Sequence, residues 1–239
     1  MPIAIISDIH ANLEALETAL AYIQQRKITT IVSLGDIVDY GPRPNECVEL
    51  VKKKCNISLM GNHDHAVVGG TDIRYFNIYA QQSVLWTRQH LLKSNLDYLS
   101  HLPFTHEENQ VLYVHSTPLH PEEWDYILSN TEAQYYFKYT NYPLIFIGHS
   151  HFPVIFSHNQ GMLEPKTTKL DLTHDRYIVN VGSVGQPRDG DPRLCFVIFD
   201  PQEATVEYVR LQYNIDKTAE EIRKVGLPDY LANRLYRGV

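Results

Sequence analysis

Short apolar runs, each followed by a polar loop, dominate the first two-thirds of the chain. Three of them come first, at Ile3–Ile6, Thr30–Leu34 and Ile57–Met60. Runs of this length are typical of strands that are buried on both faces, as in a parallel sheet covered by helices. Each run therefore predicts a central strand.

Two amphipathic segments separate these strands. Asn12 is a suitable N-cap for the first helix, and Pro44 suits the first turn of the second. Apolar residues repeat at helical spacing in both segments, at Leu13, Leu16, Leu20 and Ile23 and then at Val48 and Val51. The alternation of strand and helix predicts an α/β fold with a mostly parallel sheet.

The pattern changes between about residues 66 and 103. Ile78–Leu92 is the clearest helix there, and strand runs return only at Val111–Val114 and Leu144–Ile147. We interpret the segment from about 66 to 103 as a helical insertion beside the site. The chain as a whole, residues 1–239, has the length of one sizeable domain that carries such an insertion.

The last third of the chain is predicted to be rich in β-structure. His158–Gly161 is typical of a hairpin turn. Further strands are predicted at Val154–Ser157, Met162–Leu163, Tyr177–Asn180, Cys195–Phe199 and Thr205–Val209. Two short helices, Thr218–Val225 and Tyr230–Tyr236, are expected to close the chain.

The composition is that of a folded, acidic protein. Of the 239 residues, 44% are hydrophobic, and the formal net charge is -7. This charge argues against non-specific binding of nucleic acid or of an anionic membrane, although a small phosphate site needs only local positive charge. Three cysteines without zinc-type pairing, no signal peptide and no apolar run of transmembrane length favour a cytoplasmic location. No feature of the sequence indicates an oligomeric state.

Side chains that can bind a metal ion follow five of the predicted strands. They are Asp8 and His10 after the first strand, Asp36 after the second, Asn62 after the third, His115 after Val111–Val114, and His149 and His151 after Leu144–Ile147. Ligands of α/β sheets bind just beyond the carboxyl ends of strands. The fold can therefore bring these side chains together.

Two carboxylates, one amide and four imidazoles are too many donors for one tetrahedral ion. They suit two ions of higher coordination number that share a carboxylate. Oxygen and imidazole donors without thiolate favour manganese, iron, zinc or cobalt over calcium or copper(I). Two such ions, about 3.5–4 Å apart, can clamp the oxygens of a phosphoryl displacement and generate hydroxide near neutral pH.

Each motif has a simpler interpretation when it is taken alone. Asp8-x-His10 is more often incidental than a metal site, and Gly35-Asp36-x-x-Asp39 can be a capped turn. Gly148-His149-Ser150-His151 can be a loop with solvated histidines. Gly61-Asn62-His63-Asp64 is more specific, because a turn seldom needs all three polar side chains. Their order, each after its own strand, favours one shared site.

Together these motifs resemble the calcineurin-like metallophosphoesterases, and in detail their small bacterial and archaeal phosphodiesterase branch. The ligand motifs cover residues 7–151, and the block Asn180–Arg188 extends the resemblance to about residue 193. The resemblance implies a four-layer α-β-β-α sandwich with two facing mixed sheets and a small helical insertion. It also implies two divalent transition-metal ions, with manganese favoured and iron, zinc, cobalt or nickel as alternatives.

The resemblance also implies a role for each site residue. One metal would be held by Asp8, His10, Asp36 and His151, and the second by Asp36, Asn62, His115 and His149. His63 would donate a proton to the leaving oxygen or contact the phosphate, and Asp39 would orient His63. The related serine/threonine phosphatases carry an arginine where this chain has Tyr40. Arg43 or Arg188 is expected to bind the substrate in its place.

Two further segments have two interpretations each. Gly182–Gly185 can present backbone N–H groups to a phosphate or form a tight turn between strands. Trp86, Trp124 and Tyr126 can stack on a nucleobase or pack in the core, and packing is the more common role.

Three functions fit these observations. The first is a phosphoesterase acting on small phosphorylated substrates, namely phosphodiesters or nucleotides, including dinucleoside polyphosphates. The second is a scaffold of the same fold that binds a partner without turnover. The third is a regulator that binds a nucleotide without cleaving it. A full ligand set together with His63 favours the enzyme, because a scaffold need not retain them.

Overall fold

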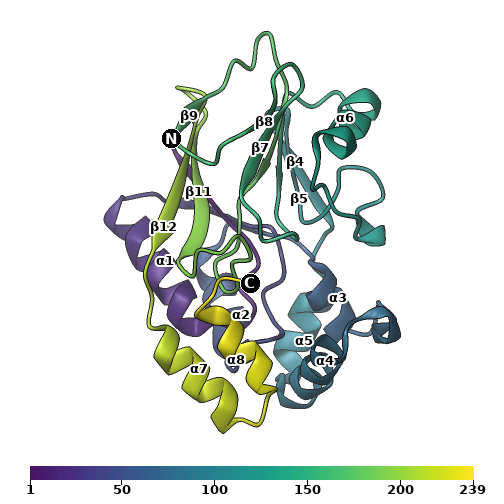
Figure 1. The fold of residues 1–239 in the computed structure, drawn as a ribbon, viewed down its shortest axis with the longest axis vertical. Coiled ribbons are helices and arrows are strands. Elements are labelled where there is room, and N and C mark those ends of the chain that lie inside the picture. The colour runs from purple at the N-terminus through teal and green to yellow at the C-terminus, as the bar shows by residue number, and fades with distance from the viewer.

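The computed structural model describes all 239 residues, which form two six-stranded sheets with helices on their outer faces (Figure 1). The first sheet has the strand order β3-β2-β1-β11-β12-β9. β1 pairs parallel with β2 and antiparallel with β11, so the sheet is mixed. Its strands are β1 (Ile3–Ile6), β2 (Thr30–Ser33), β3 (Ile57–Ser58), β9 (Thr168–Lys169), β11 (Leu194–Asp200) and β12 (Thr205–Leu211).

The second sheet is also mixed and has the order β4-β5-β6-β10-β7-β8. β5 and β10 run parallel to β6, whereas β4 and β7 are antiparallel to their neighbours. Its strands are β4 (Thr105–Glu108), β5 (Val111–Val114), β6 (Leu144–Ile147), β7 (Val154–Ser157), β8 (Gly161–Leu163) and β10 (Tyr177–Asn180).

The two sheets and their outer helices make four layers. Neighbouring residues of β1 face opposite sides, so that Ile5 enters the core between the sheets while Ile6 meets the outer helices. α1 (Leu13–Gln25) and α2 (Pro44–Lys54) cover the first sheet, and α6 (Asn130–Tyr139) covers the second. This is the α-β-β-α sandwich that the family resemblance implies.

Two groups of helices lie at the end of the sandwich where the site forms (Figure 1). The first contains α3 (Asn62–Val67), which begins before the predicted helical insertion, together with α4 (Ile78–His90) and α5 (Lys93–Ser100), which lie within it. The second is the C-terminal pair, α7 (Ile215–Lys224) and α8 (Asp229–Leu235). Apolar side chains of α7 and α8 pack against Tyr40 and Ala80, which ties the C-terminal helices to the loop after β2 and to α4.

Most elements lie close to the bounds expected from the sequence. The third strand ends at Ser58, two residues before the expected end, and the structure adds α6 in an aromatic-rich stretch where no element was predicted. α6 begins with a capping box between Ser129 and Glu132. None of the helices combines the length and apolar character that crossing a membrane requires.

Candidate metal centre

The seven candidate ligands converge from five loops that follow strands β1, β2, β3, β5 and β6. All seven side chains are buried. β1 is parallel to β2 and β5 is parallel to β6, so within each sheet the loops leave from the same end. The sheets face each other, and the loops of both therefore meet at one place.

The first cluster contains the ligand atoms of Asp8, His10, Asp36 and His151, all within 4.8 Å of one another. His151 Nε2 lies 3.2 Å from Asp8 Oδ1, and His10 Nε2 lies 3.6 Å from Asp36 Oδ2. This is the set that the family resemblance assigns to one metal.

The second cluster contains Asp36, His115 and His149 within the same limit of 4.8 Å. His115 Nε2 lies 3.4 Å from Asp36 Oδ2 and 3.2 Å from Asn62 Oδ1. Asp36 belongs to both clusters, as a bridging carboxylate would.

Main-chain carbonyl groups fix the orientation of three of the histidine rings. His10 Nδ1 donates to the Val38 carbonyl, and His151 Nδ1 donates to the Gln186 carbonyl. His149 Nε2 donates to the Trp124 carbonyl over 2.8 Å, which leaves its Nδ1 free. Such second contacts are usual for histidines that bind a metal, because they fix the tautomer.

The charges and lone pairs of this centre fit cations. Asp8 Oδ1 and Asp36 Oδ2 are buried without any hydrogen-bond partner, and a buried carboxylate is stable only when it is paired or bound to a metal. The unprotonated Nε2 atoms of His10 and His151 face each other over 3.2 Å. Two lone pairs at this separation repel each other unless a cation lies next to them.

Among the candidate ligand histidines, His115 alone has a raised pKa, which shows the same demand for positive charge. Burial lowers the pKa of His115, but the Asp36 carboxylate beside it outweighs burial and raises that pKa to about 9. Burial, followed by the charge of His115, lowers the pKa of His149 to about 3. A protonated His115 thus supplies, in part, the positive charge that metal ions would supply when bound.

Uncommon backbone conformations cluster at the ligands. Positive φ angles occur at Asp8 (54°), His10 (49°), Asp36 (52°), His149 (66°) and His151 (59°). The left-handed region is rare for residues other than glycine, and such residues gather at functional sites.

One glycine of the motifs is required by close packing at the centre. A Cβ atom added to Gly61 would lie 2.1 Å from Asp36 Oδ1. The amide of the neighbouring His63 donates to this same carboxylate oxygen over 2.8 Å. A larger residue at position 61 would therefore displace the shared carboxylate.

His63 lies at the edge of the centre and is held by Asp39. Its Nδ1 is 2.6 Å from Asp39 Oδ2, and both side chains are buried. Burial lowers the pKa of His63, but the Asp36 carboxylate and the contact with Asp39 raise it above the ordinary value. The structure thus brings together His63 and Asp39, the pair to which the resemblance gives proton donation or phosphate contact and orientation.

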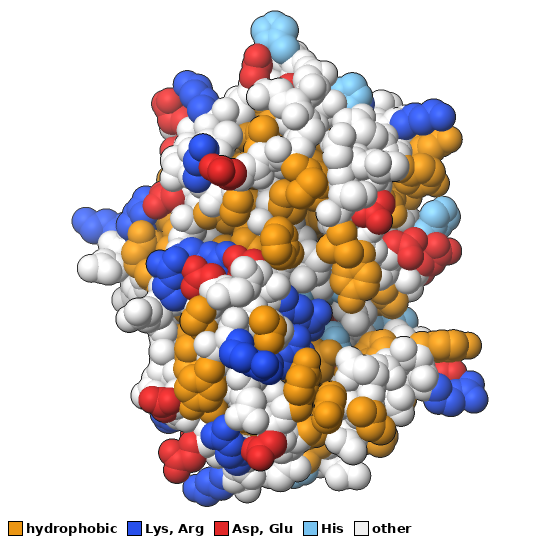
Figure 2. All heavy atoms as spheres, viewed as in Figure 1, with side chains coloured by type: hydrophobic (Ala, Val, Ile, Leu, Met, Phe, Trp, Pro, Cys, Tyr) orange, Lys and Arg blue, Asp and Glu red, His pale blue; other side chains and the backbone are white.

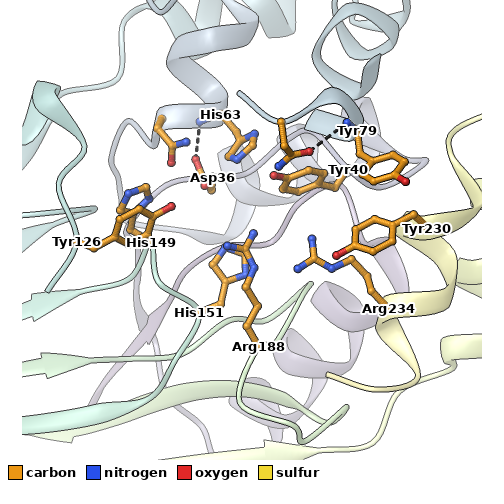
Figure 3. A pocket seen from close by; sticks show the side chains of 12 residues that line it. Asp36, Tyr40, His63, Tyr79, Tyr126, His149, His151, Arg188, Tyr230 and Arg234 are labelled. Atoms are coloured by element: carbon orange, nitrogen blue, oxygen red, sulfur yellow. Dashed lines mark hydrogen bonds between the residues drawn. The ribbon is translucent and has the colours of Figure 1, made fainter. Parts of the chain in front are cut away.

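A pocket of about 360 Å³ opens over the candidate metal ligands. Figure 3 shows its walls, which come from the β2 loop, α3, α4, the loops after β5, β6 and β10, and α8. The lining residues are Asp36, Tyr40, Asn62, His63, Asn77, Tyr79, Tyr126, His149, His151, Arg188, Tyr230 and Arg234. The pocket thus combines the proposed ligands with tyrosine and arginine side chains.

Only one of the two arginines expected to bind substrate lines the pocket. Arg188 lines the pocket, and the nearby Asp189 and Asp191 pair with Arg210 and Arg193 rather than with Arg188. Arg43 does not line it. Its guanidinium forms ion pairs with Glu221 at 2.6 Å and with Glu46 at 3.0 Å.

The loop Gly182–Gly185 holds the loop after β1. Val184 N donates to the Ser7 carbonyl, and Gly185 N donates to the Asp8 carbonyl. The Ser183 hydroxyl donates to the Asp8 carbonyl as well. These N–H groups are therefore engaged within the protein, which favours the tight-turn interpretation over a phosphate site.

Several lining residues carried no function in the sequence analysis. Asn77 and Tyr79 come from the helical insertion, and Tyr230 and Arg234 come from α8, which was expected only to close the chain. Among the aromatic candidates, Tyr126 lines the pocket and stacks on His149 with 4.1 Å between ring centroids. Trp86 stacks on His90 instead and does not line the pocket.

Comparison with known proteins agrees with this architecture. A family model described as the calcineurin-like phosphoesterase superfamily domain matches residues 1–204. An uncharacterized protein of Methanocaldococcus jannaschii is 44% identical over 242 residues, covering 99% of this chain and 98% of its own length.

Two solved structures share the fold over the whole chain. A metallophosphoesterase from Sphaerobacter thermophilus has 42% identity and a TM-score of 0.89, covering 100% of this chain and 99% of its own. A hypothetical protein from Pyrococcus horikoshii has 20% identity and a TM-score of 0.82, covering 100% and 98%.

The fold and the clustered ligands define a protein of the metallophosphoesterase class. By the family match, the chain belongs to the calcineurin-like phosphoesterase superfamily. This membership supports a hydrolase that acts on phosphate esters.

Proposed function

We propose that the protein hydrolyses phosphate esters with two divalent transition-metal ions, of which manganese is the expected metal. The Asp36 carboxylate shared by two ligand clusters carries this proposal, because one ion would need only one cluster. When bound, two such ions would supply hydroxide near neutral pH and offset the charge that develops on the phosphoryl oxygens. The chain would act as one catalytic domain with the helical insertion at its edge.

We assign the candidate ligands to the two ions as the resemblance implies. Asp8, His10, Asp36 and His151 would hold one ion, and Asp36, Asn62, His115 and His149 would hold the other. The unpartnered oxygen atoms of Asp8 and Asp36 support this division, because each faces a cluster.

His63 is proposed to donate a proton from Nε2 to the leaving oxygen. Support comes from its place in the pocket and from the Asp39 contact, which occupies Nδ1 and so leaves Nε2 available. Arg188 is proposed to contact the phosphate, because it lines the same pocket and has no ion pair. The retained His63–Asp39 pair favours turnover over a scaffold or a nucleotide-binding regulator.

The proposed substrates are phosphodiesters or nucleotides, including dinucleoside polyphosphates. A pocket of about 360 Å³ is of the size that takes a small molecule. Tyr126 and Tyr79 lie exposed in its walls and offer aromatic surface to such a substrate.

Metal analysis combined with an assay tests the proposal. Protein reconstituted with manganese is expected to hold two ions per chain and to hydrolyse bis(p-nitrophenyl) phosphate. A chelator should abolish this hydrolysis, and added manganese should restore it. A single bound ion, or hydrolysis that persists in chelator after the ions are removed, would refute the two-metal mechanism.

A further inference from the structure

Two arginines from distant parts of the chain face the same pocket. Arg188 lies in the loop after β10, and Arg234 lies on α8. Figure 3 shows both guanidinium groups directed into the pocket, with Arg188 beside His151 and Arg234 next to Tyr230. In Figure 2, Lys and Arg side chains gather in the middle of the face over α8. Positive charge therefore lines the side of the pocket next to the first ligand cluster.

Neither guanidinium is neutralised by an Asp or Glu side chain within 4.0 Å, whereas Arg210 and Arg193 nearby are both paired. Arg188 donates to Gln186 Oε1 over 3.0 Å, and its Nε is buried without a partner. Arg234 is only 9% exposed, and its one hydrogen bond runs from Nε to the main-chain oxygen of Val239. The terminal amino groups of Arg234 therefore remain available.

Aromatic rings hold Arg234 in position. Its guanidinium carbon lies 6.0 Å from the centre of the Tyr40 ring and 5.3 Å from that of Tyr230. Tyr230 in turn stacks on Tyr79, with 4.5 Å between centroids. Contacts with the face of a guanidinium leave its edge N–H groups free to bind an oxyanion.

The two charges affect each other. Burial, followed by the charge of Arg188, lowers the pKa of Arg234 to about 10. Because this value is well above 7, Arg234 remains charged at neutral pH. Two like charges in a partly buried pocket favour an anion between them, and arginine pairs best with the oxygens of phosphate or carboxylate.

We propose that Arg188 and Arg234 bind a second phosphoryl group of the substrate, next to the phosphoryl group that is attacked at the metal centre. The preferred substrates then carry two or more phosphoryl groups, as nucleoside polyphosphates do. This inference rests on the proposed phosphoesterase function and specifies its substrate class. Arg234 lies beyond residues 1–204, the part that the family model matches, so the C-terminal helices add this selectivity to the common fold.

Two phosphonates that differ by one phosphoryl group test the proposal. Methylphosphonate and methylenebisphosphonate both resist hydrolysis, so their dissociation constants can be measured by calorimetry on manganese-loaded protein. Arg234→Gln and Arg188→Gln each remove one guanidinium, and Arg234→Lys keeps the charge. Arg223→Gln is the matched control, because Arg223 lies on α7 and pairs with Asp229 outside the pocket. Chelation of manganese by the bisphosphonate is the same for every variant and cancels in the comparison.

The wild type is expected to bind the bisphosphonate more tightly than the monophosphonate. Each glutamine variant should lower the ratio of the two affinities by about 10-fold or more, the scale of a charge-assisted hydrogen bond. Arg234→Lys should keep part of the ratio, and Arg223→Gln should keep all of it. An unchanged ratio in both glutamine variants, or an equal loss of affinity for both probes, would overturn the proposal.

Misfolding of a variant and absence of hydrolysis can both be distinguished from a change in the affinity ratio. Thermal unfolding identifies a variant that fails to fold. If Arg234→Gln fails to fold, Arg188→Gln tests the proposal alone, because Arg188 lies in a loop and not on the packed face of α8. Failure of the proposed function would instead appear as wild-type protein that hydrolyses no ester with any metal. The affinity ratio does not depend on turnover, so the two failures are distinguishable.

Discussion

Asp39 Oδ2 accepts a hydrogen bond from His63 Nδ1 over 2.6 Å, inside the protein and at the edge of the pocket. This contact occupies the proton on Nδ1. When His63 is charged, the proton that it can give to a ligand is therefore the one on Nε2. The pKa of His63 is raised by the carboxylates around it, although burial opposes the charge. A general acid needs both a fixed direction and a protonated form near neutral pH.

His63→Asn should slow hydrolysis of esters with poor leaving groups while both metals stay bound. General acid catalysis contributes about 10²–10⁴-fold in rate, so kcat for an alkyl or nucleoside leaving group should fall by that factor. The loss should be smaller for p-nitrophenolate, which leaves without a proton. Metal content and kcat are measured with both kinds of substrate.

Two results would contradict this role for His63. Equal losses on both kinds of leaving group would indicate that His63 binds the phosphate instead. Loss of one metal in the variant would make it a ligand. His65→Asn is a suitable control, because His65 is on the same helix but does not line the pocket.

Asp39→Asn should lower kcat less than His63→Asn does. An amide oxygen still accepts a hydrogen bond from Nδ1 and keeps the ring in place, but the negative charge that favours the protonated ring is lost. We expect a decrease of about 10-fold, which corresponds to 1.4 kcal/mol of transition-state stabilisation. In the double variant the two decreases in kcat should not add, because both side chains act through one proton. Additive decreases would show that Asp39 acts independently of His63.

The convergence of the candidate ligands could be predicted from sequence because each lies at or just after the end of a strand. Asp8, Asp36 and His115 need only the local order of strand and loop, and the alternation of strands and helices places these loops together. Local patterns of this kind are carried by neighbouring residues, so they can be read without knowledge of the tertiary packing.

The remainder of the pocket depends on contacts between distant segments. Arg43 was expected in the pocket, but α7 brings Glu221 to it and pairs its charge. Arg234 lines the pocket only because α8 packs on Tyr40 and Ala80. No local pattern distinguishes a buried arginine of this kind from one on a solvated helix face, so the sequence assigned α8 no function.

Asp36→Asn should reduce metal content more than a change of any other single ligand. The carboxylate belongs to both clusters, so an amide removes negative charge from both sites at once. Asp8→Asn is the matched comparison, because Asp8 belongs to one cluster only. Elemental analysis after manganese reconstitution shows which of the two variants loses more metal. If the Asp36 variant keeps two ions and its activity, Asp36 does not bridge.

Removal of the metals should lower the thermal stability of the wild type. Ligands that bind only the folded state stabilise it by about 4 kcal/mol at a free concentration 1,000 times the dissociation constant. Chelator should therefore lower the unfolding temperature by several degrees, and manganese should restore it. In Asp36→Asn the unfolding temperature should respond much less to chelator. An identical response in both proteins would place the stabilising ions elsewhere.

Tyr126→Ala should change the preference among substrates without abolishing hydrolysis. Tyr126 is 44% exposed, lines the pocket, and lies parallel to His149 with 4.1 Å between centroids and an interplanar angle of 10°. Its ring therefore contacts a proposed ligand on one face and leaves aromatic surface open to a bound group. A nucleobase that stacks there would gain about 1–3 kcal/mol, which the alanine variant would lose.

The measurement is the ratio of kcat/KM for a nucleotide ester to kcat/KM for a small chromogenic ester. Because the small ester has no base to stack, Tyr126→Ala should lower this ratio by about 5- to 150-fold, the factor that corresponds to 1–3 kcal/mol. Trp86→Ala should leave the ratio unchanged, because Trp86 stacks on His90 away from the pocket. Metal content must be equal in both variants, since the contact with His149 also supports a ligand. An unchanged ratio in Tyr126→Ala with full metal content would assign this ring to packing alone.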